Sequence, residues 1–426
     1  MKPYVLLTRD EVKAEMATVR AQLNATRFEN LRLDMSRGKP SKEQLALSMP
    51  MLNDPVTPED CISDGTDVRN YGMLAGLPAA RALFAELLGT SPDRVFVGGN
   101  ASLQLMYDLI AKAYAFGLPS SPAPWSKRGL LRFLCPAPGY DRHFRISESF
   151  GFEMIPIAMT STGPDMDSVE QWVKDPSVVG MWCCPKYSNP DGIIYSDETI
   201  QRIAKLQHAA PDFTVIWDNA YVIHEFEGDY IPFPDILSLA TLNGNRHMVF
   251  EFASTSKITF PGAGISCMAS SPENIEDISK LIGVQTIGYD KINQLRHVRF
   301  LKNKEHTLAL MKQHAAVLKP RFDTVLDALQ EQIAPLDIAR WTKPVGGYFI
   351  SLYALPGTAK RTLALCREYG VTMTPAGATY PLGIDPMDSN IRIAPSMPSL
   401  KELTKAANIL CLCLRLSALE HMLQQF

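Results

Sequence analysis

The sequence predicts an α/β protein that is built on a mainly parallel sheet and carries a smaller α+β part at its end. Seven short apolar runs alternate with segments of helical periodicity, an order typical of a parallel sheet. Several runs are apolar throughout, as expected of strands that helices cover on both faces. We expect the seven strands at residues 94–97, 130–135, 154–157, 178–183, 214–217, 247–252 and 265–269.

Capping signals predict the helices. Thr8 and Glu11 make a capping-box pattern, so a first helix should run from there to about Asn30. Pro78 opens a second helix that Gly89 closes. The end of the chain departs from the strand–helix alternation, and it predicts a long helical stretch over 287–333, strands at 347–352 and 390–394, and helices at 358–369 and 399–424.

Composition excludes several classes of function. The formal net charge of −3 over 426 residues gives no general attraction to nucleic acid or to anionic lipid. The eight cysteines form no CxxC pair and mostly lie in apolar runs, which favours free thiols in a reducing cytoplasm. We see no signal peptide and no run of 18 apolar residues, so we expect no membrane segment, and we expect the amphipathic last helix to pack on the small domain.

One lysine stands among small hydroxyl residues directly after a predicted strand. The segment STSKITFPGAGIS places Lys257 behind the apolar run MVFEF. Burying a lysine costs free energy, and a lysine with a lowered pKa can attack an aldehyde to form an imine. The alternative is a surface lysine in a polar turn, and this segment alone favours that alternative.

Two further segments place polar side chains where predicted strands end. In FTVIWDNAYVIHEF the strand ends at Asp218, and Tyr221 follows. An acid at the carboxyl end of such a strand can pair with a pyridinium nitrogen, and a tyrosine beside it can bond a ring hydroxyl. In CCPKYSNPDG the Asn189 amide could contact the same ring oxygen. The alternatives are a capping aspartate, a core tyrosine and a plain turn.

A glycine-rich turn leads from the first predicted strand into a helix that begins near Ala101. The turn reads VFVGGNASLQL, so Asn100, Ala101 and Ser102 would lie at the helix N-terminus. Free backbone N–H groups at such a terminus can bind a phosphate. Turns of this kind are common, so the segment is weak when it is taken alone.

Together, the phosphate loop, the Asn-Pro turn, Asp-x-x-Tyr and the lysine resemble fold-type I pyridoxal-phosphate (PLP) enzymes of the class I/II aminotransferase group. The resemblance covers nearly the whole chain. RNYGMLAGLPAAR is similar to the family segment whose tyrosine, here Tyr71, reaches the cofactor phosphate of the partner subunit. PAPGYDRH matches the loop whose aromatic residue, Tyr140, stacks on the pyridine ring. Gly38 lies in LDMSRGKPS, which is similar to the family segment that lines the substrate. The segment KPVGGYFISL resembles a strand of the family. Arg392 lies in SNIRIAPS and would bind the substrate α-carboxylate.

The resemblance implies a set of roles. PLP would be carried by Lys257 as a Schiff base, with Asp218 on the pyridinium and with Tyr221 and Asn189 on the ring oxygen. Arg392 would hold the α-carboxylate with help from Asn189 and the Gly38 backbone. The phosphate would contact residues of the glycine-rich turn and the lysine segment: Asn100, Ala101, Ser102, Ser254 and Ser256. It also implies a homodimer with shared sites, no metal, a large domain over residues 45–300 and a small domain built from 1–44 and 301–426.

More narrowly, NASLQLMYD, STSKITFPGAG and DKINQLRH resemble the branch related to the aminotransferase domain of MocR-type proteins, some members of which are aspartate aminotransferases. Only about 30 residues precede Leu31, so we expect no DNA-binding domain. Aspartate is the expected donor and 2-oxoglutarate the expected acceptor. Arg37 and Lys39, which flank Gly38, could read a second carboxylate, or they could be solvated.

The chain departs from the family pattern at one position. Most of the group has an arginine about eight residues after the lysine, where this chain reads Gly262-Ala263-Gly264-Ile265. Another cation, such as Lys291 or Arg296, could meet the phosphate charge instead. Two alternatives to a transaminase stay open at this point: a PLP-dependent lyase or decarboxylase, and an inactive PLP-binding regulatory module.

Overall fold

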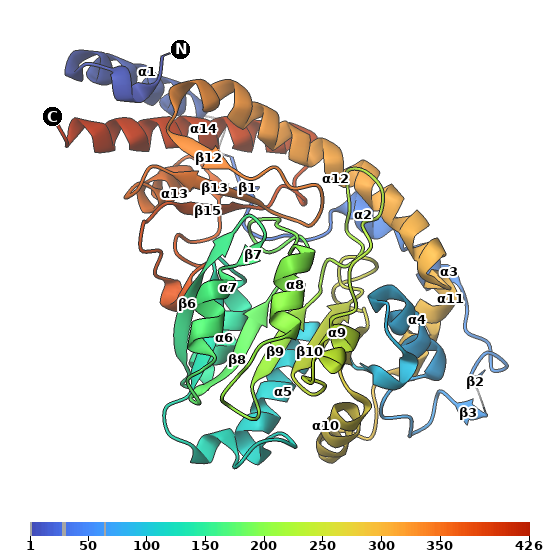
Figure 1. The fold of residues 1–426 in the computed structure, drawn as a ribbon. Helices are drawn as coiled ribbons and strands as arrows, with labels where there is room; N and C mark the ends of the chain where they lie inside the picture. The colour runs from blue at the N-terminus through green and yellow to red at the C-terminus, as the bar shows by residue number, and fades with distance from the viewer. Residues whose placement is uncertain (1, 28–30, 64) are drawn as a thin grey trace.

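A large, mostly parallel sheet forms the centre of the protein (Figure 1). The structure is a computed structural model that describes residues 2–27, 31–63 and 65–426. The order of the eight strands is β4–β11–β10–β9–β8–β5–β6–β7. They are β4 (Val95–Val97), β5 (Arg132–Ala137), β6 (Glu153–Thr160), β7 (Gly163–Pro164), β8 (Val178–Cys183), β9 (Thr214–Asp218), β10 (Val249–Ser254) and β11 (Ser266–Ala269). All seven predicted strands are present, and β7 is an additional two-residue strand at the sheet edge.

Strand β11 is antiparallel to both of its neighbours, whereas β10, β9, β8, β5 and β6 run parallel to one another. A parallel crossover needs about a dozen or more residues, usually including a helix. The connection over residues 255–265 holds no helix, so the chain turns back on itself instead. This turn carries Lys257 at the carboxyl end of β10, next to the end of β9, where Phe252 pairs with Asp218.

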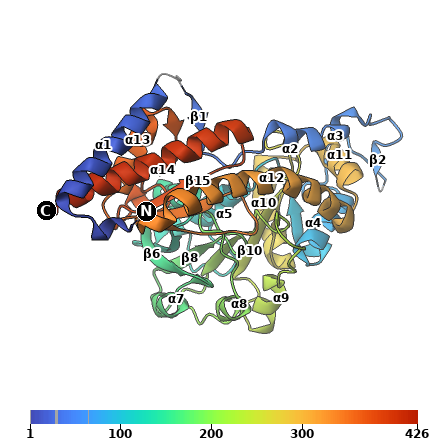
Figure 2. The ribbon, with the colours of Figure 1, turned by 90° about the horizontal axis from the view of Figure 1, so that it is seen from above.

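Helices cover the sheet. They are α4 (Pro78–Leu88), α5 (Ser102–Phe116), α6 (Asp141–Ser149), α7 (Met166–Trp172), α8 (Asp197–Ala204), α9 (Ile236–Leu242) and α10 (Pro272–Gln285). Figure 2 shows α7, α8 and α9 along one side of the sheet, and α5 packs on β10 and β11. Every residue of β8 and β9 is buried, as predicted for strands covered on both faces. Gly89 ends α4 with φ 75°, a left-handed conformation that favours glycine.

Both chain ends build a second unit, and the two termini lie at the same end of the molecule (Figure 1). Here α1 (Arg9–Thr26) packs on α14 (Leu400–Leu423), beside α12 (Lys304–Gln332) and α13 (Ala359–Glu368). The Thr8–Glu11 capping box is formed, and the predicted helix end near Asn30 lies outside the described residues. The strands of this unit are β1 (Leu33–Asp34), which pairs with β14 (Val371–Thr372), and the sheet β12 (Ala339–Trp341), β13 (Ile350–Ala354) and β15 (Asn390–Ile393).

The single helical stretch predicted over 287–333 is wrong, because the structure has two helices there. α11 (Lys291–Leu301) begins after Asp290, whose side chain accepts the Asn293 N–H at 2.9 Å. The chain then breaks at Lys302, which has φ 59°, and Asn303 caps the start of α12. Four short elements between the N-terminal segment and the sheet were not predicted: α2 (Lys42–Leu47), α3 (Pro50–Asn53), β2 (Ile62–Ser63) and β3 (Thr66–Asp67).

Buried apolar side chains form two clusters. One runs through the sheet and its helices, and the other joins the N-terminal segment to the C-terminal part of the chain, while α12 contributes to both. Domain boundaries at residues 44 and 300 stay a prediction. By length and composition α14 is apolar enough to cross a membrane, yet 61% of its most apolar window is buried inside the protein. Its packing against α1 and α12 is that of a core helix.

Candidate active site

A cavity of about 940 Å³ opens where the predicted functional segments meet. Twelve of the fourteen predicted site residues line it: Arg37, Gly38, Ala101, Ser102, Tyr140, Asn189, Asp218, Tyr221, Ser254, Ser256, Lys257 and Arg392. The other two, Asn100 and Tyr71, are not part of its lining. The volume lies within the range of small-molecule and cofactor sites, so one cofactor and a small substrate would fit.

The Lys257 amine lies at the cavity without a polar partner. Among the described residues, none accepts a hydrogen bond from its Nζ atom, which lies 5.0 Å from the centre of the Tyr221 ring and 5.7 Å from that of Tyr348. Burial lowers the pKa of Lys257, and the negative charge of Asp218 opposes this only in part. A larger share of neutral amine follows, which is the form that can act as a nucleophile or a base.

The loop that carries Lys257 is held by its own hydroxyl groups and by α11. Thr255 Oγ1 accepts the Ile265 N–H at 3.0 Å, and the Asn293 amide donates to the carbonyl oxygens of Ala263 and Gly264. Only glycine fits at position 264, because a Cβ there would lie 2.8 Å from Thr255 Oγ1. Ile265, where the family pattern has an arginine, is buried in the core, so no side chain at this position reaches the cavity as a cation.

Asp218 is oriented by a histidine that the sequence did not single out. His143 Nε2 lies 2.8 Å from Asp218 Oδ2, and its ring stacks on Trp182 with centroids 4.4 Å apart. The other carboxylate oxygen, Oδ1, is buried without a hydrogen-bond partner in the described structure. Buried acceptors are rarely without a hydrogen-bond donor, and the protonated ring nitrogen of a ligand would supply one for Asp218 Oδ1. His143 follows Tyr140 by three residues, at the start of α6, and that spacing was the available signal.

Tyr140, Tyr221 and Asn189 surround the same part of the cavity. Tyr140 meets the His143 ring edge-on at 5.0 Å, and Tyr221 is 3% exposed. Burial raises the pKa of the Tyr221 hydroxyl well above its usual value, so the hydroxyl stays a donor. Asn189 Oδ1 accepts a hydrogen bond from Arg392 at 3.2 Å, which leaves its Nδ2 atom as the donor available to a ligand.

The Arg392 guanidinium is held by Asn189, Asp141, Thr374 and the Phe349 ring, and its Nε atom stays available. Nη1 donates to Asn189 and to Asp141 Oδ1 at 3.1 Å, and the group lies 4.8 Å from the centre of the Phe349 ring. Its buried Nε atom has no partner among the described residues. Gly38 packs under this site, since a Cβ there would lie 2.8 Å from Phe349 Cζ. The arrangement leaves a donor for one carboxylate.

Backbone and serine groups gather at the N-terminus of α5. Ala101 is the N-cap residue, and its side chain makes no capping hydrogen bond. Ser254 Oγ donates to Ser256 Oγ at 3.0 Å, and Ser256 Oγ donates to the Asn100 carbonyl at 3.3 Å. The Asn100 amide instead donates to the Pro261 carbonyl at 3.1 Å, so it braces the lysine loop.

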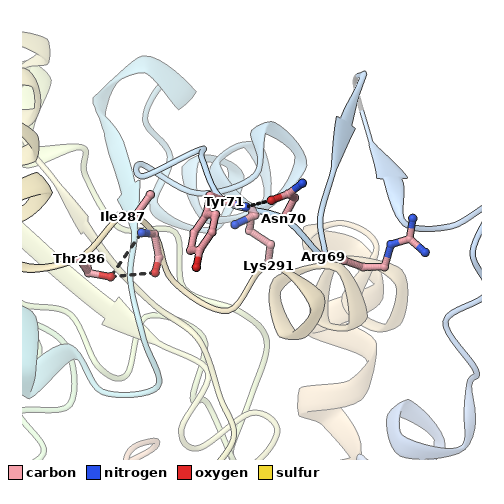
Figure 3. A pocket seen from close by; sticks show the side chains of 7 residues that line it. Arg69, Asn70, Tyr71, Thr286, Ile287 and Lys291 are labelled. Carbon is pink, nitrogen blue, oxygen red and sulfur yellow. Dashed lines mark hydrogen bonds between the residues drawn. The ribbon is translucent and has the colours of Figure 1, made fainter.

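Tyr71 lies apart from the main cavity and is 80% exposed. It lines a second hollow of about 490 Å³ together with Arg69, Asn70, Thr286, Ile287, Gly288 and Lys291. Figure 3 shows Tyr71 there with the labelled side chains of this set. Lys291 lines this hollow and not the main cavity, while Arg296 donates to the Leu52 carbonyl at 3.3 Å. Within one chain, neither of these cations reaches the predicted phosphate site. That Tyr71 enters a partner's site stays a prediction.

Known proteins resemble this chain over most of its length. The family model described as aspartate amino-transferase matches residues 7–426. An aspartate aminotransferase of Corynebacterium glutamicum is 44% identical over 95% of this chain and 93% of its own. The crystal structure of an aspartate transaminase from the same species superposes with a TM-score of 0.94, at 43% identity over 97% of each chain. An α-aminoadipate aminotransferase of Thermus thermophilus, complexed with N-(5'-phosphopyridoxyl)-L-leucine, shares the fold at 20% identity, with a TM-score of 0.72 over 98% of this chain and all of that one.

The identity and the coverage both extend along almost the entire chain, and the twelve predicted residues that line one cavity lie within the matched range. The chain therefore belongs to the aspartate amino-transferase family and is an aminotransferase.

Proposed function

We propose that the protein transfers an amino group between an amino acid and a 2-oxo acid, using pyridoxal phosphate attached to Lys257. The observation that carries this proposal is a set of three polar groups in one cavity that have no hydrogen-bond partner among the described residues: the Lys257 amine, and the buried atoms Asp218 Oδ1 and Arg392 Nε. They match an aldehyde, a protonated ring nitrogen and an α-carboxylate. Buried polar atoms rarely stay unpaired unless a ligand completes them.

Each part of the cofactor has residues that fit it. Asp218, oriented by His143, would keep the ring nitrogen protonated, and Tyr221 with Asn189 Nδ2 would donate to the ring oxygen. Tyr140 would cover the ring. When bound, pyridoxal phosphate supplies an electron sink for the bond that breaks at the substrate Cα. The N-terminus of α5 and the hydroxyl groups beside it would hold the phosphate: the backbone of Asn100 and Ala101, Ser102, Ser254 and Ser256.

Lys257 would also move a proton at the substrate Cα. Its amine lines the same cavity that would receive the amino acid, within reach of a substrate held there. Burial, which lowers its pKa, favours the neutral amine that can accept a proton. Arg392 would meanwhile hold the α-carboxylate, and its bonds to Asn189 and Asp141 fix the direction in which Nε donates.

The proposed amino donor is aspartate, with 2-oxoglutarate as acceptor. Relatives with 43–44% identity are named as aspartate transaminases. The cavity rim carries cations whose side chains have no hydrogen-bond or ion-pair partner in the described structure: Arg37, Lys39, Arg142 and Arg367. Free cations at the rim would attract dicarboxylic substrates, with a strength that falls as salt rises.

The proposed assembly is a homodimer in a reducing cytoplasm. Apolar side chains near the Tyr71 hollow are exposed, with Val284 at 90% and Ile287 at 60%. A second copy could cover them and receive Tyr71 in its own site. All eight cysteines are free thiols, which suits a reducing compartment.

Half-reactions test the proposed function. Aspartate alone should convert the visible absorbance of the cofactor-loaded protein to that of the amino form of the cofactor, and 2-oxoglutarate alone should restore it. Release of ammonia or carbon dioxide in place of this reversible exchange would contradict the proposal. The rates for a panel of amino acids would rank the donors.

A further inference from the structure

Tyr348 lies behind Lys257 and is held by a buried hydrogen-bond chain. Its side chain is 1% exposed, and its hydroxyl accepts from Gln44 Nε2 at 2.9 Å. Gln44 belongs to α2 in the N-terminal segment, whereas Tyr348 precedes β13, so the contact joins parts of the chain that are far apart in sequence. Neither Tyr348 nor Gln44 belongs to the residues proposed to hold the cofactor or the substrate.

The direction of each hydrogen bond follows from its neighbours. Gln44 Oε1 accepts the Ser41 N–H at 3.1 Å, so Nε2 must face Tyr348 and His314. His314 Nε2 lies 3.1 Å from the Ile258 carbonyl oxygen and therefore carries the proton, while His314 Nδ1 accepts from Gln44 at 3.2 Å. Burial lowers the pKa of His314 to about 4, so the ring is neutral near pH 7. Gln44 Nε2, Gln44 Oε1, the Tyr348 hydroxyl oxygen and both His314 ring nitrogens thus each have a hydrogen-bond partner.

The same chain fixes the backbone beside Lys257. The Ile258 carbonyl accepts from His314 and also from the Ser48 hydroxyl at 3.1 Å. Two donors on one carbonyl restrain the Ile258–Thr259 peptide, the second peptide after the lysine. The Tyr348 ring and the backbone next to Lys257 are therefore held by one set of contacts.

The Tyr348 ring stands next to that of Tyr221, with centroids 6.2 Å apart and planes 25° apart. Lys257 Nζ lies within 6 Å of both centroids, at 5.0 and 5.7 Å. At such distances the negative ring face attracts an ammonium group. We propose that Tyr348 is a positioning residue whose ring, held by Gln44, forms with Tyr221 an aromatic box that holds the Lys257 ammonium.

The box explains how a lysine without hydrogen bonds keeps a defined position. It favours the charged form of the amine, as does Asp218, and thereby opposes the effect of burial. The titratable groups that interact electrostatically with Lys257 are Asp218, Cys184 and His224. Burial lowers the pKa of His224 well below its usual value, so this histidine supplies no competing positive charge near pH 7. This inference rests on the proposed role of Lys257, but the box can be tested without catalysis.

The test measures the pKa of Lys257 in the full-length chain freed of cofactor. Competitive acetylation over a pH series, read by mass spectrometry, reports this pKa. Tyr348→Leu should lower the pKa of Lys257 by about half a unit or more, because the ring face is lost. Tyr369→Leu is the matched control, since it removes a buried ring of the same domain whose hydroxyl donates to Asn24. It should leave the pKa of Lys257 unchanged.

A second series keeps the shape of the ring, in case Tyr348→Leu does not fold. Tyr348→Phe, followed by phenylalanines with one, two and three fluorine atoms at position 348, weakens the negative ring face stepwise. The pKa of Lys257 should fall with each step, and kcat should change more than KM. A constant pKa through the series would overturn the box. Transamination by Lys257→Ala at the wild-type rate would instead overturn the proposed function, so the two failures are distinguishable.

Discussion

Two lysines lie in low-polarity surroundings in this protein, each with its amine within 6 Å of two tyrosine ring centres, but their hydrogen bonds differ. Lys186 is 0% exposed, and its Nζ atom donates to the carbonyl oxygens of Val222 and Ile231 at 2.8 and 2.7 Å and pairs with Glu225 at 2.5 Å. Among the described residues the Lys257 amine has no such bond, and it lies at the cavity. Burial lowers the pKa of both. The direction of the pKa shift does not separate a structural lysine from a reactive one, whereas the number of satisfied N–H donors does.

The largest expected effect concerns the lysine without partners. Lys257→Ala should slow transamination by at least about a thousandfold, because both the attachment point and the proton carrier are lost. Its thermal midpoint should stay close to that of the wild type, since no hydrogen bond is broken. Lys257→Arg, which keeps a cation over the rings without a reactive amine, should be equally inactive. Wild-type turnover by either variant, with a stable fold, would contradict the claim that Lys257 is the reactive lysine.

For Lys186, whose amine is fully hydrogen-bonded, we expect a loss of stability. Lys186→Met should lower the free energy of unfolding by about 3 to 5 kcal/mol, because Glu225 is left as an unpaired buried charge. Urea unfolding measures this loss. Lys186→Met combined with Glu225→Gln should recover part of it, since the unpaired charge is then removed. If Lys186→Met were as stable as the wild type, the claim that Lys186 stabilises the fold would be contradicted.

A smaller effect is expected at the carboxylate that His143 orients. Asp218→Asn keeps the shape of the side chain but loses its charge, so proton removal from the substrate should slow about 10- to 100-fold, equivalent to about 1.5 to 3 kcal/mol. Single-turnover absorbance with aspartate measures the rate. Asn219→Ala changes the adjacent amide, which donates to Glu251 and does not line the cavity, and it serves as the control. Equal rates for Asp218→Asn and wild type would remove Asp218 from the site.

The smallest effect is expected at the cavity rim, where charges are exposed. Arg37→Ala should raise the KM for aspartate about threefold to fivefold and leave that for alanine unchanged, because only aspartate has a second carboxylate. Lys42→Ala removes an exposed cation that does not line the cavity, and it should alter neither constant. Equal rises in KM for aspartate and alanine would mean that Arg37 does not bind the side-chain carboxylate of aspartate.

Strands and local signals were predictable from the sequence because they depend on neighbouring residues. All seven strands lie where apolar runs predicted them, and the capping box at Thr8 formed as expected. The turns that carry Asp218 and Lys257 follow strand ends, so the sheet itself brings them to one edge. The break at Lys302–Asn303 was missed because helical segments lie on both sides of the polar stretch 302–307, while a single residue of positive φ ends the first helix.

What the sequence could not predict are contacts between segments that are far apart in the chain. Gln44 reaches Tyr348 and His314 only because the N-terminal segment folds against the C-terminal part. His143 meets Asp218 across two strand–helix connections, and the Asn100 amide turns to Pro261. Periodicity contains no information on such pairings. The resemblance to a family supplied Arg392 and Gly38, which lie more than 300 residues apart in the sequence yet line one cavity.

The attachment site of the cofactor tests the central claim most directly. The purified protein with pyridoxal phosphate bound would be reduced with borohydride, digested and mapped by mass spectrometry. We predict that the phosphopyridoxyl mass is found on the peptide that contains Lys257, and that the Lys186 peptide is unmodified. A label on Lys186 or on any other lysine, with none on Lys257, would contradict the account.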